Sequence, residues 1–402
     1  MHVILFAAVD FPETDAPGER ASLIVKGLRA VEVRAVLAIP HASRTGNVAN
    51  NKRTVGKGRD VPFAYLSGHT LRPKNPFLAV LDSLRGMLAG CALLLRRKLK
   101  GKVDAVILYS PDTIEYLPII LFSLLLRIPL FIEICEMMTA STDSNWKVSF
   151  RKIGYYLTER LLPRLAHGYV VISTKLQEHY WKMMSGECIH LMPILVDQGR
   201  NFASAESAKS LGKLILYSGS FGEKDGVIYL LRAFALVVRE RPDAEFVLTG
   251  NATKLVRSAL ESMARDLKID KSIKFTGFVT RKELGTLQHQ ATVLLVCRTR
   301  SAYASHGFPW KVGEYCMSST PMVATRVGDL EKYFEDNVSI YFADPEDPPS
   351  IAAGILKALK DPQKAWAVAA KAKEVAANHF DHEIQGQKLF DFLSGRIAGR
   401  KR

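Results

Sequence analysis

Charged side chains gather between two apolar segments in the second half of the chain. Residues 292–325 read TVLLVCRTRSAYASHGFPWKVGEYCMSSTPMVAT, and this stretch contains Arg298, Lys311 and Glu314. The pattern predicts a buried strand, a long polar loop, a short helix opened by Gly307-Phe308-Pro309, and a second buried strand. Cations and helix N–H groups at the carboxyl end of a parallel sheet are suited to bind phosphate. We therefore expect a phosphorylated, nucleotide-linked ligand here.

A glycine-rich turn offers a second group of ligand contacts. Residues 217–226 read YSGSFGEKDG between an apolar segment and a helical pattern. Gly219 would let the backbone approach a ligand, and Lys224 would supply a point charge for phosphate. Taken alone the turn has a structural alternative, because a strand-turn-helix unit needs glycine in any case.

The residues of both segments resemble the retaining family-4 glycosyltransferases of GT-B fold. That family has two Glu residues with seven other residues between them, around a Gly-Phe-Pro turn, followed by a strand similar to Pro321–Thr325. Glu314 matches the second Glu, but His306 stands where the family has the first. The resemblance extends over most of the second half of the chain, and the first half matches only in outline. It implies an α/β chain with two Rossmann-like doubly wound domains facing a cleft, in a subgroup that assembles bacterial surface glycans.

The resemblance also implies roles for individual residues. Lys224 would bind the donor phosphate, and Arg298, or alternatively Arg300, would replace an Arg that the family usually has before Lys224. Glu314 would bind the ribose hydroxyls, although a helix dipole also favours a Glu there. His306 would face the donor sugar, or it is only a loop histidine. The other predicted donor-binding residues are Gly18, Gly219, Gly307, Phe308, Pro309 and Lys311.

The chemistry of the implied reaction requires such groups. Breaking a sugar–phosphate bond leaves a nucleoside diphosphate, and fixed cations stabilise the charge that develops on it. The sequence has no Asp-x-Asp motif, so we expect a metal-independent enzyme with no cofactor besides its nucleotide-sugar substrate.

Carboxylates in the first half are candidates for the acceptor side. Glu136, a predicted catalytic residue, and Glu133 lie at the end of an apolar strand, where an acid could act as a base or steer the acceptor. A solvated strand-end carboxylate is the alternative. Trp310 and Tyr303 would either stack on a ring or belong to the core.

The elements that must position these residues fit two domains, because 402 residues exceed the usual size of one. We predict an acceptor-side Rossmann-like domain over 1–200, a nucleotide-sugar-binding one over 201–379, and a C-terminal helix over 380–402 that returns to the first domain. Residues 42–60 have no periodicity and predict a surface loop, whereas 116–134 predict a buried helix and strand. The predicted strands cover residues 2–9, 32–40, 104–109, 129–134, 168–172, 213–219, 245–250, 273–277, 292–298 and 321–325.

Positive charge is concentrated in the first domain. The chain has a formal net charge of +15. Between His41 and Lys102 only Asp60 and Asp82 oppose many lysines and arginines. Within that region, Val80–Leu99 predicts a helix with a leucine-rich face and a basic end, which suits an anionic membrane surface. Only the charge would favour contact with nucleic acid, so we expect none. The remaining explanation of the positive charge is that it keeps the protein soluble.

These observations together predict a hexosyltransferase-type glycosyltransferase. It would move a sugar from a UDP- or GDP-type donor to a glycan or lipid-linked glycan, with retention implied by the family. Scattered cysteines and the absence of a cationic leader predict a cytoplasmic protein, peripheral at the inner face of the membrane. Two alternatives remain, a catalytically silent GT-B partner that binds nucleotide or membrane and a GT-B nucleotide-sugar epimerase.

Overall fold

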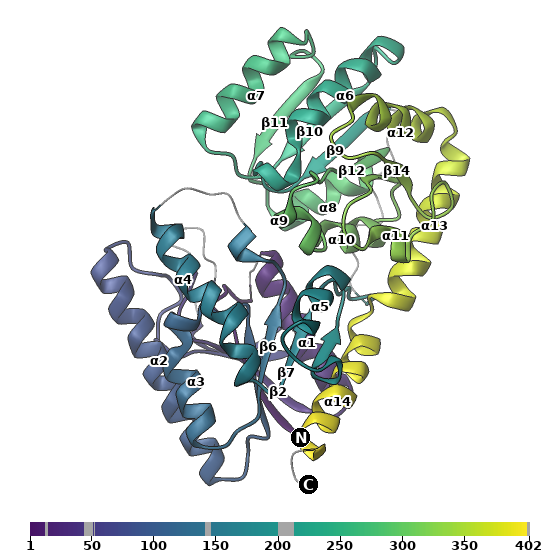
Figure 1. The fold of residues 1–402 in the computed structure, drawn as a ribbon. Coiled ribbons are helices and arrows are strands. Elements are labelled where there is room, and N and C mark those ends of the chain that lie inside the picture. Colours follow the sequence, from purple (N-terminus) through teal and green to yellow (C-terminus); the bar gives the residue numbers. More distant parts are fainter. Residues whose placement is uncertain (13–14, 44–50, 52, 141–145, 200–212, 400–402) are drawn as a thin grey trace. The chain divides into compact units, whose positions relative to one another are not determined.

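The protein consists of two compact α/β units. The computed structural model describes residues 1–402 except 13–14, 44–50, 52, 141–145, 200–212 and 400–402. The first unit combines residues 1–195 with 382–402, and the second covers 196–381. Each unit is wound around its own largely parallel sheet (Figure 1), which confirms the predicted pair of Rossmann-like domains. The unit boundaries lie a few residues from the predicted domain boundaries.

The described residues of the first unit form eight strands in the order β3-β4-β2-β1-β5-β6-β7-β8. Only β3 is antiparallel, and it forms a hairpin with β4 through Arg59 and Asp60, which both have positive φ. The strands are β1 (His2–Phe6), β2 (Arg34–Ile39), β3 (Val55–Gly58), β4 (Val61–Tyr65), β5 (Ala105–Tyr109), β6 (Leu130–Ile134), β7 (Gly168–Val171) and β8 (Ile189–Leu191).

The helices of the first unit lie in two layers. The connection from β1 to β2 runs one way across the sheet, and those from β4 to β5, β6 and β7 run the other way. Right-handed crossovers therefore place α1 on one face and α2, α3 and α4 side by side on the other. The helices are α1 (Ala16–Ala30), α2 (Pro76–Leu99), α3 (Thr113–Leu125), α4 (Trp146–Arg160), α5 (Thr174–Trp181) and α14 (His382–Gly399).

The C-terminal helix α14 belongs to the first unit, where it packs along α1. The contact is close because it is made by glycines: a Cβ on Gly27 would overlap the carbonyl oxygen of His382, and one on Gly386 would overlap the backbone of Gly27. Small residues at both positions let the two helix backbones approach each other.

In the second unit, the part that the structure describes has six parallel strands in the order β11-β10-β9-β12-β13-β14. Its apolar core lies between the strands and α6 and α12, with Phe234, Phe246 and Leu295 among its members. The strands are β9 (Leu214–Ser218), β10 (Glu245–Thr249), β11 (Ile273–Gly277), β12 (Val293–Val296), β13 (Met322–Thr325) and β14 (Tyr341–Ala343). The helices are α6 (Val227–Glu240), α7 (Lys254–Asp266), α8 (Arg281–Gln290), α9 (Ala302–His306), α10 (Lys311–Met317), α11 (Leu330–Tyr333), α12 (Pro348–Lys360) and α13 (Pro362–His379).

Four expectations about individual segments need correction. The predicted loop 42–60 contains strand β3, although residues 44–50 and 52 lie outside the described part. Gly18, which was expected in the loop after the first strand, lies in the first turn of helix α1, because that helix begins at Ala16 and has Pro17 as its next residue. The polar loop after β12 contains the short helix α9. The buried helix expected near residue 116 is α3, but it exposes one apolar face.

Candidate active site

The second unit has its topological switch point at β9. This strand pairs with β10 on one side and with β12 on the other. The chain passes from β9 to β10 on one side and from β12 to β13 on the other, so the segments after β9 and β12 diverge at the carboxyl edge of the sheet. Open α/β sheets bind their ligands at such a point. Most of the residues predicted to bind a donor follow these two strands.

Glycines keep the carboxyl end of β9 open. Gly219 and Gly250 have φ values of +153° and +140°, a conformation that side chains disfavour. A Cβ on Gly250 would overlap the carbonyl oxygen of Gly219. Gly219 was predicted from the sequence, but Gly250 was not, because it lies at the end of the neighbouring strand β10.

Lys311 lies over the end of β9. Its Nζ is 3.4 Å from Asp225 Oδ1 and 4.1 Å from the centroid of the Tyr217 ring. Asp225 is buried and also accepts a hydrogen bond from Ser220 Oγ. Tyr315 Oη accepts a bond of 3.0 Å from the Ser218 backbone N–H, which fixes helix α10, and therefore Lys311, to the strand.

The pKa values of Lys311, Asp225 and Tyr217 depend on their neighbours' charges. Burial lowers the pKa of Lys311, nearby Arg298 lowers it further, and Asp225 opposes both effects. Burial would raise the pKa of Asp225, but Lys311 and Arg298 outweigh it and hold that pKa below its ordinary value. Burial, followed by the charge of Asp225, raises the pKa of Tyr217 well above its ordinary value. Lys311 therefore has a lowered pKa beside a carboxylate whose own pKa is also lowered.

Arg298, directly after β12, is a buried cation that is not fully satisfied. The residue is 6% exposed, and its Nε and Nη1 have no hydrogen-bond partner among the described residues. Its backbone is held firmly, since Thr325 Oγ1 accepts from its N–H at 2.7 Å and donates to its carbonyl oxygen at 3.0 Å. Buried polar nitrogens without partners are costly. An anionic ligand would remove that cost.

Lys224, which was predicted to bind phosphate, lies against Tyr303. Lys224 Nζ lies 3.4 Å from Tyr303 Oη and 4.6 Å from the centroid of the same ring. Lys224 also contributes to the lowered pKa of Asp225. Lys224, Arg298 and Lys311 are therefore all within electrostatic reach of Asp225.

Glu314 lies one turn along α10 from Lys311. Its Oε1 accepts from Trp310 Nε1 at 3.3 Å and lies 3.5 Å from Arg281 Nη2. The half-buried carboxylate is oriented by two side chains, which suits a residue that accepts hydroxyl hydrogen bonds. Trp310 thus contacts Glu314 instead of being fully buried in the core.

The Gly307-Phe308-Pro309 turn before α10 is buried, so its side chains are not exposed for a ligand. His306 ends α9, and its Nδ1 lies 2.7 Å from the carbonyl oxygen of Ala302. Gly307 and Pro309 are buried. Phe308 packs against Tyr333 and Phe380 at ring distances of 5.7 and 5.6 Å, so its side chain belongs to the core. Arg300, the alternative second cation, is exposed.

In the first unit, Glu136 is the predicted residue that lines a hollow. It follows β6 and shares this hollow with Ser110, Tyr155 and Glu159. Both carboxylate oxygens of Glu159 lie 2.8 Å from Thr139 Oγ1. Gly18 belongs to the same unit, where it occupies the first turn of α1, so its N–H has no acceptor within that helix.

Glu133 is not available to a ligand. It is fully buried and pairs with Arg20, whose Nε donates to its Oε1 at 2.6 Å. Arg20 Nη1 and Nη2 donate to the carbonyl oxygens of Pro193 and Met192 at 2.6 and 2.8 Å. The idea that Glu133 forms part of the acceptor wall is therefore wrong. This pair joins α1, β6 and the segment after β8.

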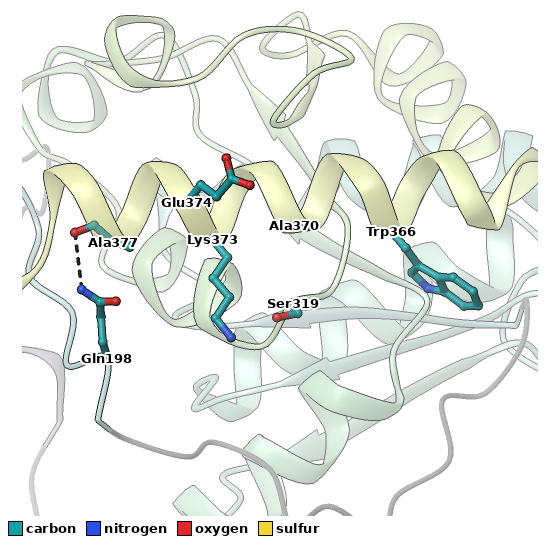
Figure 2. Close-up of a pocket in the computed structure, with 7 residues that line it drawn as sticks. All are labelled: Gln198, Ser319, Trp366, Ala370, Lys373, Glu374 and Ala377. Carbon is teal, nitrogen blue, oxygen red and sulfur yellow. Dashed lines mark hydrogen bonds between the residues drawn. The ribbon is translucent and has the colours of Figure 1, made fainter.

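A separate hollow lies along α13. Figure 2 shows it, with a volume of about 390 Å³. Gln198 Nε2 at its edge donates to the carbonyl oxygen of Ala377 at 3.5 Å and to Asp381 at 2.9 Å. None of the predicted site residues lines this hollow. Its lining consists of Gln198, Ser319, Trp366, Ala370, Lys373, Glu374 and Ala377.

Sequence reasoning missed the residue at the centre of the cation group. Asp225 follows Lys224 directly, yet the turn was interpreted only through its glycines and its lysine. A carboxylate next to a phosphate-binding lysine is a signal that the sequence contained. The aromatic supports Tyr217 and Tyr315 gave no such signal, because buried tyrosines are common at strand ends and in helices.

Known proteins resemble the second unit in sequence and both units in fold. Residues 200–375 match the family described as Glycosyl transferases group 1. The chain is 27% identical over 180 residues to the GDP-mannose-dependent alpha-(1-6)-phosphatidylinositol monomannoside mannosyltransferase of Mycolicibacterium smegmatis, covering 44% of this chain and 47% of that protein. It is 29% identical over 161 residues to the uncharacterized glycosyltransferase MJ1607 of Methanocaldococcus jannaschii, covering 40% and 39%. The chain therefore spans less than half the length of these curated relatives.

Solved structures resemble the whole chain. Anabaena Alr3699/HepE in complex with UDP and glucose superposes with a TM-score of 0.72 at 16% identity, covering 98% of this chain and all of the other. Sucrose-phosphate synthase from Thermosynechococcus elongatus gives a TM-score of 0.72 at 14% identity, covering 99% and 100%. At these identities the likeness shows the fold. Both units thus adopt the folds of GT-B glycosyltransferases, and the sequence of residues 200–375 matches the Glycosyl transferases group 1 family.

Proposed function

We propose that the protein is a metal-independent glycosyltransferase that uses a nucleotide-sugar donor of UDP or GDP type. The observation that carries this proposal is the set of three cations at the switch point of the second unit. Arg298 is buried with two unpartnered nitrogens, and Lys224 and Lys311 lie within reach of the same carboxylate. Three cations and one carboxylate leave a formal charge of +2 (3 − 1) at this site.

That charge suits the leaving group of the proposed reaction. A nucleotide sugar carries roughly two negative charges on its diphosphate, and more charge develops when the sugar bond breaks. Thr325 holds the backbone of Arg298 and Asp225 holds the ammonium of Lys311 before any ligand arrives, so the site needs little reorganisation. Glu314, positioned by Trp310 and Arg281, would accept hydrogen bonds from the ribose hydroxyls. Retention of anomeric configuration is part of the proposal, supported by the resemblance of the domain to retaining enzymes.

The acceptor would be a glycan or a lipid-linked glycan. Glu136 is the acceptor-side residue of the proposal, because it lines a hollow at the carboxyl edge of the first sheet with hydroxyl groups beside it. The relative from Mycolicibacterium smegmatis is named for a phosphatidylinositol-linked acceptor, which supports a membrane setting. We place the protein at the inner face of the cell membrane.

A thermal-shift panel of UDP, GDP, ADP and dTDP tests the donor class. A ligand at 100 times its dissociation constant should stabilise the protein by about 2.7 kcal/mol. We expect one diphosphate to shift the wild type and to shift Glu314→Ala less, because the ribose contact is lost. No shift by any diphosphate would contradict the proposal.

Product release tests the activity itself. The donor whose diphosphate binds should be hydrolysed slowly without acceptor, with release of that diphosphate. Lys224→Ala should reduce this rate at least tenfold, while Lys282→Ala, an exposed lysine on α8, should leave it unchanged. Equal rates for both variants would exclude the role of Lys224.

A silent nucleotide-binding protein is the second candidate, and position 306 favours it. His306 replaces the family's Glu, and its ring nitrogen is engaged by its own helix. A diphosphate shift without product release from any donor would support this candidate. An altered sugar configuration in the recovered donor, seen by NMR, would instead indicate an epimerase.

A further inference from the structure

Helix α2 exposes a row of large apolar side chains. Phe77, Leu81, Leu84, Leu88, Leu95 and Leu99 follow a helical spacing, and each is between 40% and 79% exposed. Side chains three or four positions apart lie on one side of a helix. One whole side of α2, over its full length, is therefore apolar and uncovered.

The opposite side of α2 is packed into the first unit. A Cβ on Gly86 would overlap the carbonyl oxygen of Pro40, and one on Gly90 would lie 2.5 Å from Ile119. Met87 and Leu94 on this side are also buried. By length and composition α2 is apolar enough to cross a membrane, but a crossing would separate it from these contacts. The packing instead favours a helix that lies along a surface.

Helix α3 extends the apolar side of α2. Ile114, Leu117, Leu121 and Leu125 share one side of α3 and are between 41% and 74% exposed. The two helices pack against each other in the same layer (Figure 1). We call these ten side chains of the two helices the α2–α3 face. Monomeric proteins rarely expose contiguous apolar surface of this kind without a binding role.

The charges around the α2–α3 face are almost all positive. α2 ends in Arg96, Arg97 and Lys98, and Arg127 follows α3 as an exposed residue. The one acid of each helix is engaged: Asp82 lies 2.6 Å from His69 Nδ1, and Glu115 lies 2.6 Å from His41 Nε2. An apolar surface with a basic border matches the boundary between acyl chains and anionic headgroups.

We propose that the α2–α3 face docks on an anionic lipid bilayer, with its leucines inserted at the headgroup–acyl boundary and α2 parallel to the membrane. The proposal rests on the proposed function for its setting, since it names the membrane on which a lipid-linked acceptor would be met. It differs from attraction by charge alone, because the apolar side chains hold the protein after the cations have drawn it in. Salt therefore distinguishes the two modes of binding.

Vesicle flotation of the full chain tests the proposal. The vesicles are phosphatidylcholine alone or phosphatidylcholine with about one third phosphatidylglycerol, at 0.1 M and 1 M NaCl, where the Debye length falls from about 10 Å to 3 Å. We expect the wild type to float with the anionic vesicles and to remain largely bound after transfer to high salt. Complete release at 1 M NaCl would overturn insertion and leave adsorption by charge.

Matched leucine variants locate the binding surface. Leu88→Glu combined with Leu121→Glu places one acid on each helix and should lower the bound fraction at least tenfold. Leu255→Glu changes an 81% exposed leucine on α7 of the second unit and should bind like the wild type. Equal binding by the double variant and the control would overturn the proposal. Arg96→Gln with Lys98→Gln should slow recruitment and reduce binding at 0.1 M NaCl.

A fluorescence measurement covers the case in which the double variant does not fold. Leu88→Trp should show a blue shift and strong quenching by lipids brominated on the acyl chains, beyond the quenching of the native tryptophans. Absence of additional quenching would contradict insertion.

Two further readouts separate this proposal from its competitors. A wild-type dimer without lipid that Leu88→Glu with Leu121→Glu converts to a monomer would assign the face to a second copy of the chain and overturn lipid docking. The diphosphate shift depends on the second unit, so it should persist in every variant here. A wild type that shows the diphosphate shift but does not bind the anionic vesicles refutes only the membrane proposal. A wild type that binds the vesicles but shows no diphosphate shift refutes only the proposed donor site.

Discussion

Two buried arginines, one in each unit, differ in how completely their nitrogens are hydrogen-bonded. Arg20 in the first unit has a hydrogen-bond partner for each of its three nitrogens, including the buried carboxylate of Glu133. Arg298 in the second unit is nearly as buried, yet two of its nitrogens have no partner among the described residues. A satisfied buried cation holds a fold together, whereas an unsatisfied one is suited to an anion that is not part of the chain. The comparison therefore separates a structural arginine from a binding arginine.

Replacing Arg20 should have the largest effect, and it acts on stability. Arg20→Met leaves Glu133 buried without its cation and leaves two backbone carbonyls without donors. We expect a loss of about 3–5 kcal/mol in the free energy of unfolding, measured by denaturant titration. Arg29→Met, an exposed arginine on the same helix, should change little. Similar unfolding midpoints for both variants would remove the structural side of the comparison.

Replacing Arg298 should act on binding instead. Arg298→Met removes a buried charge with two unpartnered nitrogens, so the free energy of unfolding should be unchanged or higher. The affinity for the nucleoside diphosphate should fall by about 1.5–3 kcal/mol, or at least tenfold, measured by calorimetry. Arg300→Met alters an exposed arginine two residues away and should keep the affinity. A large loss of stability in Arg298→Met would mean that Arg298 resembles Arg20 after all.

Thr325 connects the stability of the site with its affinity. Thr325→Val preserves the shape of the side chain but removes both hydrogen bonds to the backbone of Arg298. We expect a loss of about 1–3 kcal/mol in the free energy of unfolding and a smaller loss of diphosphate affinity than in Arg298→Met. An affinity loss as large as that of Arg298→Met would show that Thr325 positions the cation more tightly than we infer.

The smallest expected effect is a change in pH dependence. Because burial lowers the pKa of Lys311, diphosphate binding should weaken, as pH rises, before the ordinary lysine pKa is reached. Asp225 raises the pKa of Lys311 against that effect, so Asp225→Asn should move this loss of binding to lower pH. Lys311→Met should bind more weakly and lack this alkaline loss. An alkaline profile that is the same in all three proteins would exclude Lys311 as its source.

Asp225→Asn should also change how the stability of the protein depends on pH in the acid range. The folded-state pKa of Asp225 is held below its ordinary value, so its ionised form contributes stability that is present above the unfolded pKa of about 3.9. That contribution is lost as pH falls through the lower, folded-state pKa. Asp225→Asn should therefore show a shallower loss of stability in this acid range, measured by thermal unfolding against pH.

Local sequence was sufficient for much of the fold. The alternation of apolar runs and helical patterns predicted the strands that became β1, β2, β5, β6, β7, β9, β10, β11, β12 and β13, because buried parallel strands are short and almost continuously apolar. It missed the short strands β4, β8 and β14. It also missed β3, which is a half-exposed edge strand with two glycines, and α9, which has only five residues. Both depend on packing more than on their own propensity.

Sequence alone therefore determined the two doubly wound units and the residue types of the proposed donor site, because periodicity and glycine placement are local properties. Only the tertiary structure decided which charges are satisfied. Arg20 meets Glu133 and the backbone of Met192 and Pro193 across more than a hundred residues, and Asp225 meets Lys311 from another helix. The same holds for the leucines of α2 and α3, since a leucine in a helical pattern is apolar whether it faces the sheet or the solvent. Burial and hydrogen-bond pairing depend on residues far apart in the sequence. Here they distinguish residues of the core from residues of the proposed binding site.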